Sequence, residues 1–198
     1  MPKDGTKTKE DIIKKSLELF SSKGFFHTSV KDICKATGLT KGALYNYFTT
    51  KEEVWFACHE KASQEWRSIV FSGVRKIDNP VDRVKKVIEN DLKYYIGQDV
   101  LIGGSFFFRM LVEFANESSP IGDIIISGYN DLEVLLASWL DDARNRGLLA
   151  DGINAKGLAR LIIVTLSGAA ALFSATRDLS ILDETIRQLH GYIDHLKL

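Results

Sequence analysis

The sequence predicts an all-α protein of about nine helices. Apolar residues recur at helical spacing along most of the 198 residues, and no segment alternates apolar and polar residues as a half-buried strand does. Residues that commonly start helices, and glycines that commonly end them, stand where these patterns begin and end. Because 45% of the residues are hydrophobic, the chain can bury a substantial core.

The first two helices have clear boundary signals. The first is expected over about 7–23, where apolar residues form one stripe and Gly24 follows as a stop. The second begins after Thr28 or Ser29, either of which can cap it. Asp32 is placed to complete a capping box with Ser29.

The third helix is short and follows a turn at Gly38. Thr40 is its expected cap, and Phe48 is its expected end. A helix, a short turn containing glycine and a second short helix with exposed polar residues make a helix-turn-helix. In that motif the second helix enters the major groove of DNA.

The remaining helices form a larger unit. Thr50 and Glu53 make a box that starts a fourth helix, and Pro80 suits the first position of a fifth. Asn154 is expected to cap the eighth helix, and Ser180 with Asp183 the ninth. The fourth to ninth helices are expected over about 50–73, 80–97, 104–114, 120–146, 154–176 and 180 onwards. We therefore expect a three-helix head at 1–50 and a helical body at 51–198.

The charges are unevenly divided along the chain. Residues 1–51 hold ten lysines and five acidic residues (+5), and the rest holds 16 basic and 21 acidic residues (−5), although the whole chain is neutral. Such an asymmetry favours a head that faces a polyanion. On charge alone, a lysine-coated solvated helix explains the same numbers equally well.

The outer face of the third helix suits contact with nucleic acid. At 100° per residue, Leu44 and Phe48 share the buried side. Gly42 costs about 1 kcal/mol relative to alanine inside a helix, which makes sense if a partner must approach the backbone closely. Tyrosine hydroxyls can bond phosphates, and Asn46 can bond base edges, most naturally adenine. The outer residues are Gly42, Ala43, Tyr45, Asn46 and Tyr47.

Lys51 stands at the first position of the fourth helix, where a cation opposes the helix dipole. A phosphate bound there would be held by free backbone N–H groups and by the lysine together. An exposed lysine that merely extends into solvent is an equally good interpretation.

Residues 24–48, followed by Lys51 and Glu52, resemble the N-terminal signature of TetR-family transcriptional regulators over about a quarter of the chain. Tyr47 stands where that family often has histidine, and Cys34 where it usually has alanine; we interpret Cys34 as a small buried thiol. The resemblance implies operator contacts by Thr40, Lys41, Gly42, Tyr45, Asn46, Tyr47 and Lys51, with Thr28, Ser29 and Lys31 as supporting contacts.

The last two helices predict a homodimer. The helix over 154–176 is apolar on nearly every side, so it must be buried on every side, and one face is expected to meet a second subunit. The last helix repeats apolar residues at 4-3-4-3 spacing, which suits a partner helix but equally suits the core of one chain. The family resemblance favours the dimer, with two reading helices about 34–36 Å apart on a palindromic site. The expected interface residues are Leu161, Thr165, Leu172, Leu182, Ile186, Leu189 and Ile193.

An aromatic region in the body predicts a small-molecule pocket, because such pockets are largely apolar with a few polar groups. Core packing explains each aromatic residue at least as well. The C-terminal part resembles a common TetR-family sensor type, but Ser105 follows the glycines where some members carry a sensor cysteine, so that redox mechanism is not supported. The expected ligand contacts are Trp66, Tyr94, Phe106, Phe107, Arg109, Met110, Glu113 and Trp139.

The function predicted from the sequence is that of a ligand-responsive repressor, which binds a palindromic operator as a dimer and is released by a small molecule. The alternative is an effector-independent architectural dimer that binds DNA or a partner. The four histidines are scattered and no nucleophile, phosphate loop or metal cluster stands out, so we expect no enzyme, cofactor or metal. Without a signal peptide or a membrane-length apolar segment, and with two cysteines, the chain is expected in a reducing cytoplasm.

Overall fold

The structure is a computed structural model that describes residues 5–101, 105–115 and 117–197. Within these residues the chain forms nine α-helices, one 3-10 turn and one π-helical segment, and it contains no strand. The all-α prediction is therefore confirmed. The elements are α1 (Gly5–Lys23), α2 (Val30–Thr37), α3 (Lys41–Tyr45), α4 (Lys51–Val70), η1 (Val74–Lys76), α5 (Pro80–Glu89), η2 (Asn90–Ile96), α6 (Phe106–Glu113), α7 (Pro120–Asn145), α8 (Ala155–Thr176) and α9 (Leu179–His195).

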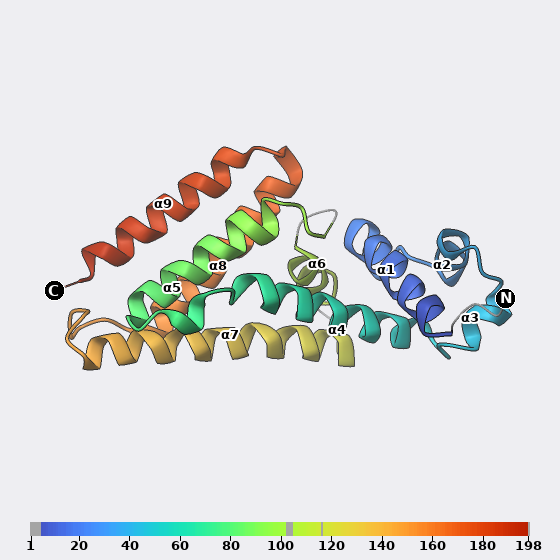
Figure 1. Cartoon of the computed structure of the whole chain (residues 1–198), viewed down its shortest axis with the longest axis horizontal. Helices are drawn as coiled ribbons and strands as arrows, with labels where there is room; N and C mark the ends of the chain where they lie inside the picture. The colour runs from blue at the N-terminus through green and yellow to red at the C-terminus, as the bar shows by residue number, and fades with distance from the viewer. Residues whose placement is uncertain (1–4, 102–104, 116, 198) are drawn as a thin grey trace.

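The helices build an elongated molecule whose two termini lie at opposite ends (Figure 1). Helices α1, α2 and α3 form one end, and α4 runs from this head into the body. In the body, α7 packs on α5 and α8, α8 packs on α9, and α4 packs on η2. Helix α4 thus carries the chain from the three-helix head into the body of long helices.

The apolar core continues from the head into the body. Phe20, Ile33 and Leu44 bring α1, α2 and α3 together in the head and are almost fully buried. In α4, Trp55 stacks on Phe106 with ring centroids 5.9 Å apart, and its indole N–H donates to the Met110 sulfur at 3.2 Å. The buried residues of head and body form one cluster, so burial does not divide the chain at residue 50, and the domain boundary there stays a prediction.

The caps of the head follow the sequence signals, with one exception. The Ser29 hydroxyl accepts from the Asp32 amide at 3.1 Å and the Asp32 carboxylate accepts from the Ser29 amide at 2.9 Å, which confirms the capping box. Thr40 caps α3 as expected. However, α3 ends at Tyr45 and not at Phe48. The backbone amides of Tyr47 and Phe48 both donate to the Leu44 carbonyl, so the regular helical pattern stops there.

Two boundaries in the body also differ from the prediction. Helix α9 begins at Leu179, and its cap is Asp178, whose carboxylate accepts from the Ser180 amide at 2.9 Å. Arg177 ends α8 in the left-handed conformation (φ 59°). This turn lets α9 begin at Leu179, earlier than the start predicted with Ser180 as the cap. Helix α6 begins after Ser105, and the expected start at Gly104 lies outside the described residues.

The fifth helix, expected to be continuous to about residue 97, changes into a π-helix at Asn90. The Asn90 side-chain amide donates to the carbonyls of Val70 and Ser72, at 2.9 and 3.0 Å, where α4 ends. This buried amide therefore satisfies carbonyls that the end of a helix leaves free. A π-helical turn is wider than an α-helical turn and is frequent at functional sites.

Helix α8 is the one helix in the described part of the chain that is long and apolar enough to pass for a membrane span, with a mean hydropathy of 1.8. It packs between α7 and α9, and 44% of its most apolar window is buried inside the chain. We therefore assign it as a core helix that keeps one apolar face exposed.

Candidate nucleic-acid interface and ligand cavity

The outer face of α3 is largely exposed. Leu44 and Phe48 point inward and are nearly fully buried, as the helical periodicity predicts. Lys41, Gly42 and Asn46 are exposed. A Cβ atom added at Gly42 would meet no atom within 4 Å, so internal packing does not require glycine there. The remaining physical reason for a glycine is close approach of something outside the chain.

The two tyrosines of this segment differ in exposure. Tyr45 is 41% exposed, and the Lys41 ammonium lies 5.6 Å from its ring centroid. Tyr47 is half-buried, because the helix has already ended and the chain no longer carries this side chain to the outer face. Ser29 and Lys31 are exposed at the start of α2. These residues form a polar and basic surface around α3.

Thr28 cannot belong to this surface. It is fully buried, and its hydroxyl donates to the Gly24 carbonyl at 2.7 Å. The predicted supporting contact with DNA is therefore wrong for Thr28, because its only polar group holds the turn between α1 and α2.

Lys51 is turned inward as well. Its ammonium donates to the Phe25 carbonyl at 3.0 Å and lies 3.9 Å from the centroid of the Phe25 ring. Burial lowers the pKa of this lysine, and the nearby carboxylates of Glu52 and Glu113 oppose that change. In this conformation Lys51 holds the head to the first turn of α4, and its predicted contact with phosphate stays a prediction.

Glu113 binds the same turn, between α1 and α2, from the body. Its two carboxylate oxygens accept from the backbone amides of Phe25 and Phe26, at 2.8 and 2.7 Å. Gly24 permits this approach, because it has a φ of +88° and a Cβ there would lie 2.6 Å from the carboxylate. Phe114 packs on both phenyl rings, with centroids 5.4 and 4.9 Å away. Glu113 is therefore a link between head and body, and its assignment as a ligand contact is wrong for this structure.

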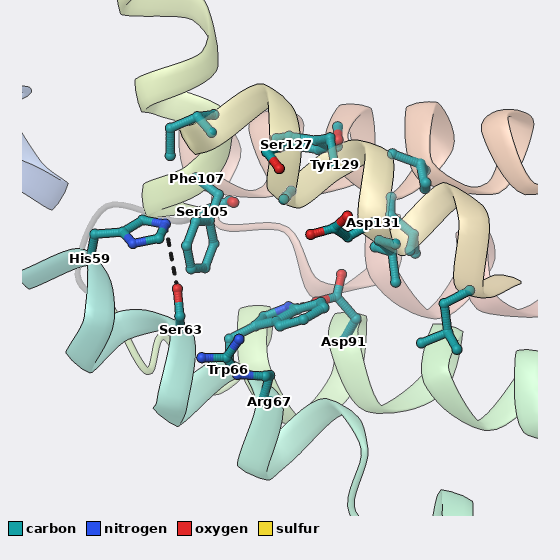
Figure 2. Close-up of a pocket in the computed structure, with 18 of the residues that line it drawn as sticks. His59, Ser63, Trp66, Arg67, Asp91, Ser105, Phe107, Ser127, Tyr129 and Asp131 are labelled. Atoms are coloured by element: carbon teal, nitrogen blue, oxygen red, sulfur yellow. Dashed lines mark hydrogen bonds between the residues drawn. The ribbon is translucent and has the colours of Figure 1, made fainter. Parts of the chain in front are cut away.

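A cavity of about 430 Å³ opens between α4, η2, α6, α7 and α8. Trp66 and Phe107, both expected ligand contacts, line it (Figure 2). The polar and charged side chains of its wall are His59, Ser63, Arg67, Asp91, Ser105, Ser127, Tyr129, Asp131 and Ser167. An apolar enclosure with a few convergent polar groups is typical of small-molecule sites.

The other expected ligand contacts lie elsewhere. Phe106 and Met110 are fully buried in the core beneath Trp55, so they cannot reach a ligand in the cavity. Tyr94 is 42% exposed and points to solvent beside two lysines. Arg109 and Trp139 are half-buried and outside the cavity wall.

Asp91 is the functional candidate that the sequence did not reveal. It lies in the π-helical segment, and its carboxylate accepts from the Trp66 indole N–H at 2.8 Å. Burial raises the pKa of Asp91 to about 6, with the Trp66 hydrogen bond acting in the opposite direction. No local motif predicts this site. The hydrogen-bond partner Trp66 is 25 residues away in the sequence, and we recognise no sequence signal for the π-helix.

The comparisons with known proteins agree with this architecture. Residues 12–58 match the family described as "Bacterial regulatory proteins, tetR family", and residues 80–189 match the one described as "Tetracyclin repressor-like, C-terminal domain". The chain belongs to the TetR family. It is accordingly a DNA-binding transcriptional regulator of the helix-turn-helix type and not an enzyme.

Relatives of this TetR-family regulator are similar along most of their length. The uncharacterized HTH-type transcriptional regulator YvdT of Bacillus subtilis is 25% identical over 189 residues, which cover 87% of this chain and 86% of YvdT. The HTH-type transcriptional regulator UidR of Escherichia coli (strain K12) is 24% identical over 175 residues, 86% of this chain and 84% of UidR. A TetR transcriptional regulator from Chloroflexus aurantiacus shares the fold, with a TM-score of 0.90, 24% identity and coverage of 98% and 97% of the two chains.

In this TetR-family regulator, the residues expected at the dimer interface fall into three groups by their exposure. Leu182 and Ile193 are buried against their own chain and present no surface to a partner, whereas Leu189 is nearly fully buried but lines the groove between α8 and α9, so its contact with a partner stays a prediction. Leu161 and Leu172 are 45% and 57% exposed. Thr165 and Ile186 are half-buried.

Neither Cys34 nor Cys58 forms a disulfide bond. Cys58 is buried under α1, where its thiol donates to the Ile13 carbonyl, and burial raises the pKa of that thiol. Cys34 is half-buried in α2.

Proposed function

We propose that this regulator is a ligand-responsive repressor, which binds a palindromic operator as a homodimer in the cytoplasm and is released by a small molecule. The observation that carries the proposal is the position of α6. Its first turn borders the cavity through Ser105 and Phe107, and its last residue, Glu113, holds the turn between α1 and α2. One short helix therefore touches both the candidate ligand and the DNA-binding head.

Helix α4 provides the second connection. His59, Ser63 and Trp66 of α4 line the cavity, and Lys51 at the start of the same helix bonds the Phe25 carbonyl. A ligand that shifts α4 or α6 must therefore also shift the head. Since the coupling between two sites is reciprocal, bound operator lowers ligand affinity by the same factor by which the ligand lowers operator affinity.

At the operator, α3 is proposed to lie in the major groove. Lys41, Tyr45 and Tyr47 contact phosphates and sugars, Asn46 bonds a base edge, and Gly42 lets the backbone approach. Thr40, Ser29 and Lys31 lie beside α3 and contact the flanking phosphates. Lys51 adds a phosphate contact only if its bond to Phe25 opens on binding.

The alternative of an effector-independent architectural dimer makes no use of the cavity. A cavity of about 430 Å³ with aromatic walls and convergent polar groups is typical of a small-molecule site. The cavity therefore favours the sensor over the alternative.

The test is DNase I footprinting of the purified protein on the DNA that flanks its gene. We expect protection of one short palindrome, and release when a compound that binds the protein is added. Binding to many fragments without sequence preference would contradict the proposal and favour the architectural dimer.

A further inference from the structure

We propose that the cavity takes an organic cation, a protonated amine carried on an aromatic body. This rests on the proposed function, since it assigns a ligand class to the proposed sensor cavity. Three features of the wall carry the argument: flat aromatic faces, two carboxylates and the position of the basic side chains.

The aromatic faces define the shape of the ligand. Trp66 meets Phe71 edge-on, with centroids 5.5 Å apart, and meets Phe107 at 6.3 Å. All three rings line the cavity, and Tyr129 adds a fourth from α7. Aromatic walls bind flat apolar groups and also attract cations through their ring faces.

The carboxylates define its charge. Asp91 projects into the cavity from η2 and Asp131 from α7, and their carboxylates point toward the same space (Figure 2). Asp91 has one hydrogen bond, from Trp66, and its other oxygen remains available. Among the described residues neither carboxylate forms an ion pair with a lysine, arginine or histidine.

A buried carboxylate without a cation is unfavourable, because burial penalises its charged form. At neutral pH Asp91 is nevertheless ionised for the most part, since its pKa is about 6. An ammonium group beside Asp91 would replace the hydration that this carboxylate has lost, and the exposed Asp131 would add to the attraction. This is the chemical reason for assigning a cation and not a neutral ligand.

The basic side chains of the wall do not reverse this assignment. Arg67 is exposed, so its charge is largely hydrated. Burial lowers the pKa of His59, which disfavours its charged form. Asp131 is exposed as Arg67 is, so the enclosed charge of the wall is that of Asp91, and an anionic ligand would have to approach Asp91 against repulsion.

The test uses three probes of nearly equal size: 2-(1-naphthyl)ethylammonium, 2-(1-naphthyl)ethanol and 1-naphthylacetate. Titration calorimetry of the full chain at pH 7.5 is expected to give an affinity for the ammonium about tenfold or more above that for the alcohol. The acetate is expected to bind most weakly. Equal binding of ammonium and alcohol, or tightest binding of the acetate, would overturn the proposal.

Variants locate the charge that is recognised. Asp91→Asn keeps an oxygen for the Trp66 indole and is expected to lower ammonium affinity about tenfold while leaving the alcohol unchanged. Asp131→Asn, at an exposed position on the cavity wall, is expected to act in the same direction with a smaller effect. Asp183→Asn removes an equal charge from the exposed surface of α9 and serves as the control, with affinity unchanged. If both cavity variants bind the ammonium like the wild type, the assignment is wrong.

Failure of this inference differs from failure of the proposed function. Calorimetry needs no DNA, so ligand class is measured independently of repression. Release of the operator only by the alcohol or the acetate would overturn the cation and leave the repressor intact. Tight binding of the ammonium without any effect on a protected operator would support the ligand class and contradict the ligand-responsive repressor.

Discussion

Asn46 is the exposed amide at the end of α3, next to a glycine that internal packing does not require. It can donate and accept at one base edge, which is the geometry that reads adenine. The lysines around it carry charge but no sequence information. We therefore expect Asn46 to provide sequence specificity and the surrounding lysines to provide affinity.

We predict that Asn46→Ala changes the preference among operator sequences. The loss of one bidentate base contact should cost about 1–3 kcal/mol on the preferred half-site and little on sequences changed at that base pair. Competition binding with single-base variants of the operator measures this difference. Asn130→Ala, an exposed amide on α7, is the matched control. A uniform loss across all sequences would assign Asn46 to the DNA backbone instead.

Asp91 illustrates how one residue can favour a ligand at the expense of stability. Its ordinary pKa is 3.8, and burial raises its pKa in the folded protein to about 6. Between these two values the unfolded chain has released a proton that the folded chain still holds. Raising the pH from about 4 to 6 therefore favours unfolding, and above 6 the penalty is constant.

We predict that Asp91→Asn is more stable than the wild type at pH 7.5, by roughly 1–3 kcal/mol. The asparagine cannot ionise, and it can still accept from the Trp66 indole. Scanning calorimetry should show a Tm several degrees higher at pH 7.5. The difference should shrink as the pH falls toward 4. A variant that is less stable at every pH would mean that the carboxylate contributes to the fold itself.

At the level of elements, helix ends were predictable where their signals are local. Ser29 with Asp32, Thr40, Pro80 and Asn154 begin helices as expected, because a cap needs only the first turn of its own helix. The hydrogen bonds of Asn90 in the π-helical segment and of Glu113 with the Phe25 turn join groups that are 18 to 88 residues apart in the sequence. Such contacts leave no periodic or neighbouring pattern in the sequence, so the cavity wall and the link between head and body could not be predicted.

Helix α6 is expected to transmit the ligand signal, because it has a polar anchor at each end. We predict that Glu113→Gln weakens the link. An amide offers one acceptor oxygen, so one of the two backbone N–H groups loses its partner, at a cost of about 1–3 kcal/mol. The Tm should fall, operator affinity should fall, and the effect of ligand on operator affinity should become smaller.

Thermal unfolding and operator titrations with and without a bound ligand measure these three quantities. Glu117→Gln, an exposed residue just beyond the same helix, is the control and should behave like the wild type. If Glu113→Gln lowers the Tm while the ligand effect on operator affinity stays unchanged, then Glu113 is structural and coupling runs through α4.

At the level of the whole molecule, residues 1–51, the head with the first residue of α4, carry a charge of +5 and the rest carries −5. One copy has one reading helix, at the far end of an elongated chain (Figure 1). A palindromic site therefore requires a second copy, joined at a surface distant from the DNA. The apolar face of α8 has this position, with Leu161, Val164 and Leu172 exposed along one stripe. A shallow groove between α8 and α9, bordered by Leu161 and Tyr192, continues this face.

We predict that Val164→Glu dissociates the dimer. Val164 is 63% exposed on α8, so a glutamate there leaves the single chain undisturbed but would be buried without a partner in the dimer. Val134→Glu on α7 places the same charge at a residue 67% exposed on another face, and it should remain dimeric. Sedimentation velocity at micromolar concentration distinguishes the two variants.

The same variants also test the effect of dimerisation on DNA binding. Because two linked heads bind about 10²–10⁴ times more tightly than one, the monomer should lose that factor on the full palindrome but bind a half-site like the wild type. If Val164→Glu stays dimeric, or if only Val134→Glu dissociates, the partner lies on α7 and the spacing of the two reading helices must be set by that face.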